Sequence, residues 1–120
     1  MHKIFFYKAP NGREPVLDYM KDLAKKHDKD SRLNLRKMQD YVSLLGQYGT
    51  EIGVPYVKHI EGDIWELRPL RNRILFVGWI DGSFVLLHQF LKTTQKTPAR
   101  EITKARAEFA DLKGRNGNEE

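Results

Sequence analysis

The chain has 120 residues, 40% of them hydrophobic, which fits one domain with one core. It contains no cysteine, which excludes disulfides, thiol nucleophiles and thiolate metal sites. A formal net charge of +5 and a sequence pI of about 9.5 favour an anionic partner, although net charge says nothing about fold.

The first predicted elements are a strand and a helical hairpin. Residues 3–8 suit a strand, and this apolar run is too short for a signal sequence or a membrane span, so we expect a cytoplasmic protein with no membrane partner. Pro15 suits the first position of a helix, and an apolar stripe at helical spacing continues to about Lys26. A polar connector over 27–30 then leads into a longer helix that ends at Gly49.

The middle of the chain predicts a sheet. A short strand is expected over 56–60, and three consecutive antiparallel strands over 64–68, 73–80 and 83–92, because β-branched and aromatic runs alternate there with turn residues.

The Asp-Gly pair at 81–82 predicts a two-residue hairpin turn, and this turn sets the register of the last two strands. Leu75 then lies opposite His88, and Arg73 lies opposite Phe90. One face is predicted to be nearly all apolar and covered by helices: Ile74, Phe76, Gly78, Ile80, Val85, Leu87, Gln89 and Leu91. The other face has Arg73, Leu75, Val77, Trp79, Phe84, Leu86, His88, Phe90 and Lys92.

The strand before this hairpin adds an arginine. If Trp65 lies on the apolar face, alternation along the strand places Arg68 on the same face as His88. A two-residue turn at 71–72 would then place Arg68 opposite Leu75, in one row with His88. An arginine, a histidine and the lysine that ends the last strand are therefore predicted to converge on an open face of the sheet.

A final helix is predicted from Thr97, as the cap, and Pro98, in the first turn. Residues 1–113 are expected to form the domain, and 114–120 a frayed tail. The order strand, helix, helix, four strands, helix is typical of an α+β fold with a mostly antiparallel sheet.

WELR at 65–68 and LHQFLKTTQKTP at 87–98 belong to a pattern that spans 5–112, and the segment 87–98 is its most specific part. This pattern resembles the RelE/ParE superfamily of toxins, most closely the phage-derived, HigB-type RelE-like toxins. The resemblance implies a RelE-like sheet with helices on one face, and ribosome-dependent, metal-independent cleavage of mRNA without a cofactor. It also implies a hetero-oligomeric complex with a cognate antitoxin, often a helix-turn-helix protein. ParE-type members instead inhibit DNA gyrase and are not nucleases, so this alternative stays open.

Cleavage of RNA by its own 2′-hydroxyl needs a proton acceptor, a cation beside the phosphate and an acid for the leaving 5′-oxygen. Arg68 is predicted to clamp the phosphate and His88 to act as acid or base, with Lys92 and Arg73 stabilising charge. Glu66 is an alternative base. The residues expected to contact the RNA are Lys58, Arg71, Lys96 and His59.

Structural interpretations of the same residues compete with these roles. His88 lies in an apolar strand, where a lone histidine is often a hydrogen-bonded core residue. Arg68 is two residues from Glu66 on one face and could serve as its ion-pair partner. The four histidines are scattered without ligand spacing, so no metal site is predicted.

Overall fold

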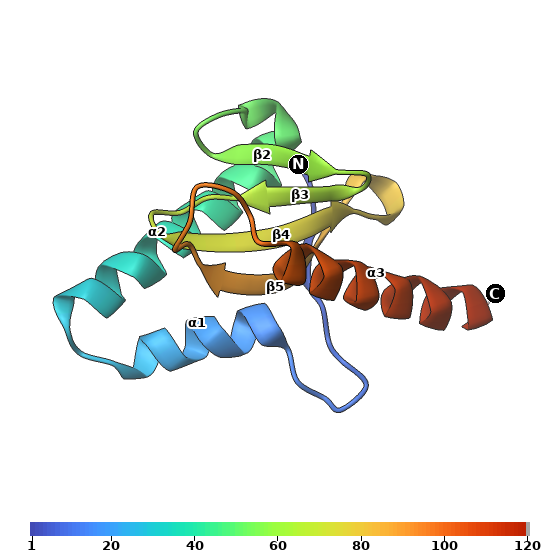
Figure 1. Cartoon of the computed structure of the whole chain (residues 1–120), viewed down its shortest axis with the longest axis horizontal. Coiled ribbons are helices and arrows are strands. Elements are labelled where there is room, and N and C mark those ends of the chain that lie inside the picture. The colour runs from blue at the N-terminus through green and yellow to red at the C-terminus, as the bar shows by residue number, and fades with distance from the viewer. Residues whose placement is uncertain (120) are drawn as a thin grey trace.

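The computed structural model describes residues 1–119, with side chains through residue 115. Within this range the chain forms three α-helices and five β-strands (Figure 1). The helices are α1 (Pro15–Lys25), α2 (Lys29–Tyr48) and α3 (Ala99–Glu119). The strands are β1 (Ile4–Phe6), β2 (Val57–Glu61), β3 (Ile64–Leu67), β4 (Asn72–Gly78) and β5 (Phe84–Leu91). Short 3₁₀ turns cover Gly49–Ile52 and Ile80–Gly82.

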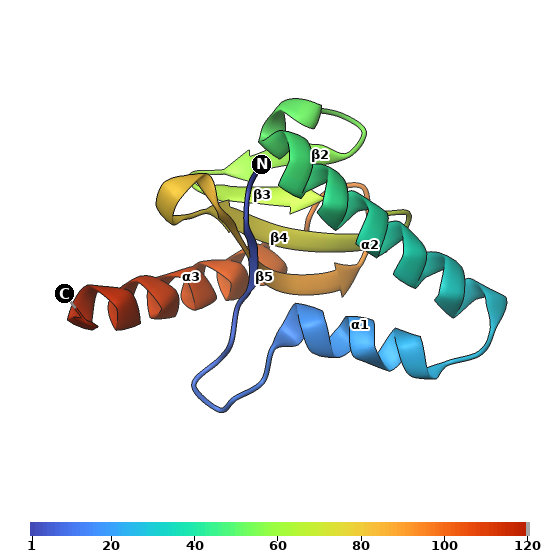
Figure 2. The same cartoon turned by 180° about the vertical axis from the view of Figure 1, so that it is seen from behind.

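The strands form one sheet in the order β1-β5-β4-β3-β2, in which β1 is parallel to β5 and the other neighbours are antiparallel. Helices α1 and α2 lie on one face of this sheet and α3 lies on the other (Figures 1 and 2). The predicted α+β class is therefore confirmed. The expectation of an open second face is wrong, because α3 packs there against β3, β4 and β5.

The helices of the hairpin begin and end at residues that favour helix termini. Helix α1 begins at Pro15, whose missing N–H costs nothing in a first turn. Helix α2 begins at Lys29, inside the predicted connector, because the Asp28 carboxylate caps it by accepting a hydrogen bond from the Ser31 N–H over 2.9 Å. It ends at Tyr48 and is followed by Gly49, which has a φ of 67° that glycine adopts readily.

The turn between β4 and β5 is one residue longer than predicted. Asp81 and Gly82 have φ angles of 56° and 74°, as an Asp-Gly turn requires. The Ser83 N–H closes this turn on the Ile80 carbonyl over 3.1 Å. However, it is Trp79 and not Ile80 that donates back to the Ser83 carbonyl, over 2.8 Å. The two strands therefore leave the turn one residue out of the predicted register.

A β-bulge restores the predicted register farther along the same pair of strands. Leu75 pairs with His88, as predicted, whereas the next residue, Phe76, pairs with Leu86. Leu87 is the extra residue on the bulged strand. Between the turn and the bulge, the β5 side chains consequently face the opposite way from the prediction.

The sheet separates two apolar cores. The core on the α1–α2 side includes Leu67, Ile74, Phe76, Phe84 and Leu86. The core on the α3 side includes Leu75, Val77, Val85, Leu87 and Ala105. Both faces of β4 and β5 are thus buried. This burial holds the two strands in place, and they carry part of the candidate site.

The connection between β3 and β4 also differs from the prediction. Glu66, not Arg68, pairs with Leu75, so the predicted two-residue turn is wrong. A longer loop follows Arg68 and contains Leu70 at a φ of 57°. Glu66 therefore takes the place predicted for Arg68 in the row with Leu75 and His88.

The start and the end of α3 were predicted less well. Thr97 does not cap the helix, because its hydroxyl donates to Glu66 instead. The helix continues to Glu119, through most of the segment predicted as a frayed tail, and residue 120 lies outside the described residues. No helix in the described range combines the length and apolar character needed to cross a membrane.

Candidate functional site

A small basic hollow lies on the α3 side of the sheet, beside the loop that joins β5 to α3. We call residues 92–97 of this loop the strap. The hollow is lined by Lys58, Glu66, Arg68, Arg73, Phe90, Lys92, Gln95, Lys96 and Thr97. Among these lining residues, five are basic and one is acidic. Such an excess of positive charge in a concave surface suits an anionic ligand.

Strand pairing brings the floor of the hollow together. Lys58 of β2 lies opposite Glu66 of β3. Arg73 of β4 lies opposite Phe90 of β5, as predicted. Residues that lie opposite one another share a face of the sheet, so these side chains gather on the α3 side. The strap then adds its two lysines from the end of β5.

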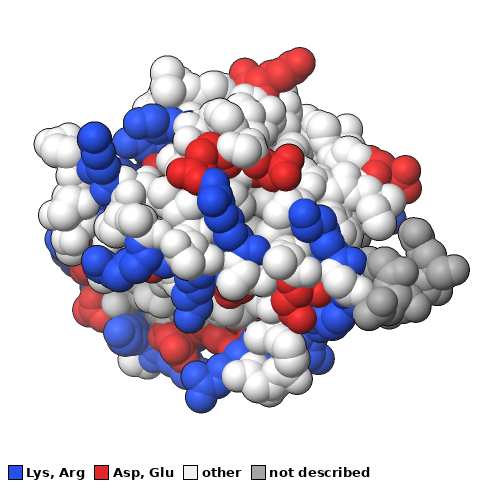
Figure 3. Space-filling model, turned by 45° about the vertical axis from the view of Figure 1, so that its right-hand side comes forward, with Lys and Arg blue, Asp and Glu red and all other residues white. Residues whose placement is uncertain are grey.

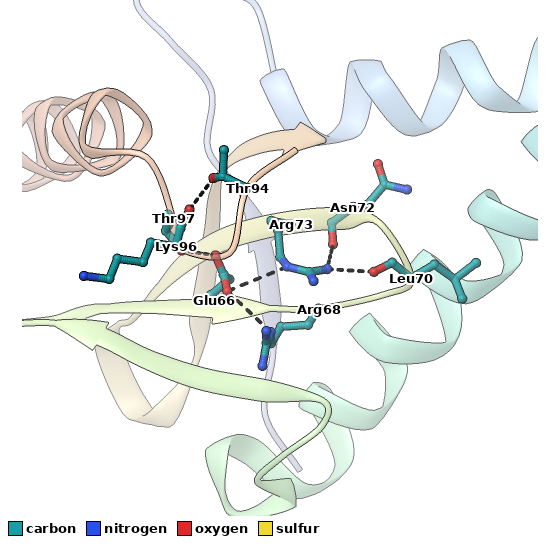
Figure 4. A network of polar contacts seen from close by, with 8 residues as sticks. All are labelled: Glu66, Arg68, Leu70, Asn72, Arg73, Thr94, Lys96 and Thr97. Atoms are coloured by element: carbon teal, nitrogen blue, oxygen red, sulfur yellow. Dashed lines mark hydrogen bonds and ion pairs between the residues drawn. The ribbon is translucent and has the colours of Figure 1, made fainter. Parts of the chain in front are cut away.

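Glu66 is the centre of the polar contacts in the hollow (Figure 4). The residue is only 3% exposed. One carboxylate oxygen, Oε1, lies 3.5 Å from Arg68 Nε and 3.8 Å from Arg73 Nε. The other, Oε2, accepts a hydrogen bond from the Thr97 hydroxyl over 2.6 Å. A buried carboxylate needs such partners, because burial of an unpaired charge is costly.

Arg73 is held inside the protein. It is 7% exposed, and its Nη1 donates to the carbonyls of Leu70 and Asn72, over 2.8 Å in each case. Burial lowers the pKa of Arg73, the positive charge of Arg68 lowers it further, and Glu66 opposes both effects. Arg73 therefore holds the β3–β4 loop in place, and its positive charge lies at the floor of the hollow.

Arg68 is the more accessible of the two arginines. A quarter of its side chain (25%) is exposed. Its Nε is buried beside Glu66 but makes no hydrogen bond within the described residues. The ion pair with Glu66, proposed from the sequence as a structural role, does form. It engages only the Nε edge of the guanidinium, so the Nη edge can bind a ligand.

Arg71 lines a second hollow next to the first, together with Lys92, Thr93, Thr94 and Gln95. The Lys92 N–H donates to the Arg71 carbonyl over 2.8 Å, which ties the start of the strap to the β3–β4 loop. Of the residues predicted to contact RNA, Lys58 and Lys96 thus line the basic hollow and Arg71 lies beside it.

His88 does not line the basic hollow, although it is on the correct face. It is 9% exposed, and its Nε2 lies 2.7 Å from Glu101 Oε1 on α3. Its ring stacks with Phe90 at a centroid distance of 6.1 Å. The predicted convergence of three residues is therefore met for Arg68 and Lys92 and not for His88, because α3 covers the imidazole.

His59 lies on the other side of the sheet from the hollow. It pairs with Trp65, whose ring is 5.0 Å from the imidazole between centroids. Its Nε2 is 2.7 Å from the Gly62 carbonyl. Because neighbouring residues of a strand point to opposite faces, His59 and Lys58 cannot contribute to the same side.

The surface outside the hollow carries charges of both signs. Figure 3 shows acidic side chains between the basic ones over the face that it presents. The positive charge is therefore not one continuous patch in this view, and the arrangement within the hollow is more informative than net charge. Within the described residues, no group of three or more His, Cys, Asp or Glu could hold a metal ion.

The family model of phage-derived Gp49-like proteins (DUF891) matches residues 18–110, well over half of the chain. The chain belongs to this family. Gp49-like proteins are associated with RelE-like and other toxin-like proteins, and the α+β fold is consistent with a RelE-like fold. No curated protein matches the chain.

Two features of this Gp49-like site were missed at the sequence level. The sequence predicts Glu66 as a base or as a partner of Arg68, and does not show that its carboxylate also binds Arg73 and Thr97. The sequence predicts no role for Glu101. The spacing of Glu66 and Arg68 was a usable signal, but nothing local indicates which residues of the strap or of α3 would reach the sheet.

Proposed function

We propose that this Gp49-like protein is the toxin of a type II toxin–antitoxin pair and acts as a RelE/HigB-like, ribosome-dependent mRNA endoribonuclease. The observation that carries the proposal is the basic hollow, which is lined by an accessible arginine, a buried arginine and three lysines. Family membership supports a toxin-like protein in general. The partners in this proposal are mRNA on the ribosome and a cognate antitoxin.

The hollow would act mainly by stabilising charge. Attack of a 2′-hydroxyl on the adjacent phosphate builds negative charge on the non-bridging oxygens, and fixed cations stabilise that charge in the transition state. In this proposal Arg68 binds two phosphate oxygens through its Nη edge. Lys92 and Lys96 approach from the strap, and Lys58 approaches from β2. No step of this chemistry uses a metal ion or a cofactor.

The hollow offers few groups that could accept or donate the protons of this reaction. Its carboxylate, Glu66, already binds two arginines and a threonine. The imidazole of His88 is paired with Glu101 beneath α3. This observation favours, as a second candidate, a non-enzymatic ParE-type inhibitor of DNA gyrase, which would need the basic surface but no acid or base.

One experiment separates the two candidates. The protein is induced in cells, and transcript ends and plasmid supercoiling are measured in the same culture. Breaks in mRNA with the period of codons would support the nuclease. Loss of gyrase supercoiling with intact transcripts would support the gyrase inhibitor, and growth without either effect would contradict both. An adjacent reading frame for a helix-turn-helix protein would support the proposed antitoxin.

The first prediction concerns Arg68. If the Nη edge stabilises the phosphate, Arg68→Ala lowers the rate of mRNA cleavage by about 10²- to 10³-fold, as removal of one transition-state donor does in other enzymes. Cleavage is measured on purified translating ribosomes. The matched control is Arg32→Ala, at an exposed position of α2, which should retain full activity. Equal activity of both variants would contradict the role of Arg68.

A further inference from the structure

The strap is attached to the sheet at few points. At its start, the Lys92 N–H donates to the Arg71 carbonyl over 2.8 Å. Within it, the Thr94 hydroxyl donates to the Lys96 carbonyl over 2.7 Å. At its end, the Thr97 hydroxyl donates over 2.6 Å to a buried carboxylate, that of Glu66 (Figure 4). The Thr97 bond is thus the strap's side-chain link to the floor of the hollow.

The same carboxylate also orients the accessible arginine. Glu66 Oε1 faces the Nε of Arg68 at 3.5 Å. Among the described residues, no hydrogen bond or ion pair occupies the two terminal nitrogens of Arg68. Arg73, in contrast, already binds two carbonyls through Nη1. Of the two guanidiniums near Glu66, one is therefore committed to the fold and the other is presented to a ligand.

The charge of Glu66 also makes this cluster of cations possible. Like charges a few ångströms apart repel one another strongly where water is excluded. In this hollow, Arg68 and Arg73 approach the same buried oxygen, and lysines of β2 and the strap line the same small space. A single buried negative charge offsets part of that repulsion while no anion is bound.

We propose that Glu66 is the positioning residue of an anion site, in which its two oxygens orient Arg68 and hold the strap through Thr97, so that cations from β3 and the strap face one phosphate. The inference rests on the proposed function, because the phosphate is taken to belong to RNA. Glu66 itself does not touch the phosphate. The site binds the phosphate while the Thr97 hydroxyl is hydrogen-bonded to Glu66.

The test uses Thr97, because substitution of Glu66 would leave the buried Arg73 without its counter-charge and could unfold the protein. Thr97→Val keeps the shape of the side chain and removes the donor, whereas Thr97→Ser keeps the donor. Thr103→Val, at an exposed position of α3, is the matched control. Thermal unfolding checks that all three variants fold.

The first readout is titration of each protein with inorganic phosphate, followed by NMR at the Arg68 Nε–H. Wild type, Thr97→Ser and Thr103→Val should bind with similar affinity, and Thr97→Val about tenfold more weakly, as expected for loss of one hydrogen bond to a charged group. Equal affinity in Thr97→Val and Thr97→Ser, or absence of phosphate binding in folded wild type, would overturn the inference.

The second readout is mRNA cleavage on ribosomes. The inference expects Thr97→Val to raise KM about tenfold with a smaller change in kcat, and Thr97→Ser to restore the wild-type KM. A KM for Thr97→Val equal to that of wild type would overturn the positioning role. If phosphate binds with the expected pattern but wild type cleaves no mRNA, the anion site stands and the proposed nuclease fails. The two failures are thus distinguishable.

Discussion

Two buried glutamates in this protein have opposite surroundings. Glu66 lies among arginines that stabilise its negative charge. Glu108 of α3 is 8% exposed, and its Oε1 has no hydrogen-bond partner within the described residues. Burial raises the pKa of Glu108 to about 7, and the nearby charge of Lys104 only partly opposes this. Glu108 thus folds most favourably in its neutral form.

This raised pKa predicts a dependence of stability on pH. Between about pH 4.5 and 7, the unfolded chain has released the Glu108 proton and the folded protein still holds it, so stability falls as pH rises. The loss attributable to Glu108 is at most about 3 kcal/mol. Glu108→Gln should match wild type near pH 4 and be the more stable protein at pH 8. Urea unfolding at both pH values measures the difference.

The control for this measurement is Asp22→Asn, an acid-to-amide change at an exposed position of α1, which should shift stability little at either pH. A gain in Glu108→Gln that is the same at both pH values would show that titration of this carboxyl is not its cause.

At the scale of single elements, the start of α2 shows that a local capping signal can determine where a helix begins. The carboxylate of Asp28 accepts a hydrogen bond from the Ser31 N–H and another from the Ser31 hydroxyl, each over 2.9 Å. These bonds, the backbone one first, lower the pKa of Asp28. The capped turn starts the helix at Lys29, within a segment whose polar composition alone had predicted a connector.

The cap gives a prediction for α2. Asp28→Ala removes the acceptor at the first turn and should lower the melting temperature by several degrees, whereas Asp28→Asn keeps a side-chain oxygen and should lower it much less. Because the pKa of Asp28 is lowered in the folded state, the stabilisation from its carboxylate is present at neutral pH and lost on acidification. Thermal melts by circular dichroism measure both effects, and equal melts for the two variants would argue against capping.

For the whole molecule, the decisive feature is that α3 closes the second face of the sheet. The helix adds an apolar core that includes Leu87 and Ala105. It also places Glu101 against His88, so that the histidine joins the α3 layer to β5. A residue predicted to be a free acid or base is consequently a buried contact between two layers, in agreement with the structural interpretation that the sequence had left open.

Substitution of His88 separates these two roles. Glutamine can still donate to Glu101, so His88→Gln should remain folded and keep the proposed cleavage activity within a few-fold if the contact is structural. His88→Ala should lose about 1–3 kcal/mol of stability, because Glu101 then loses its partner on β5. Chemical unfolding and ribosomal cleavage are measured for both. A stably folded His88→Gln that cleaves mRNA a hundredfold more slowly would instead assign the imidazole to catalysis.

The sequence by itself determined the class of fold, the helical hairpin and the position of the Asp-Gly turn between β4 and β5. These depend on signals within a few residues, such as alternation along a strand, capping and the positive φ of an Asp-Gly turn. Only the tertiary structure decided the length of the β3–β4 loop, the bulge in β5 and the docking of α3. It also decided that Glu66, through Thr97, anchors the strap. Those features are set by packing between segments far apart in the chain, where burial and the pairing of buried charge outweigh local preference.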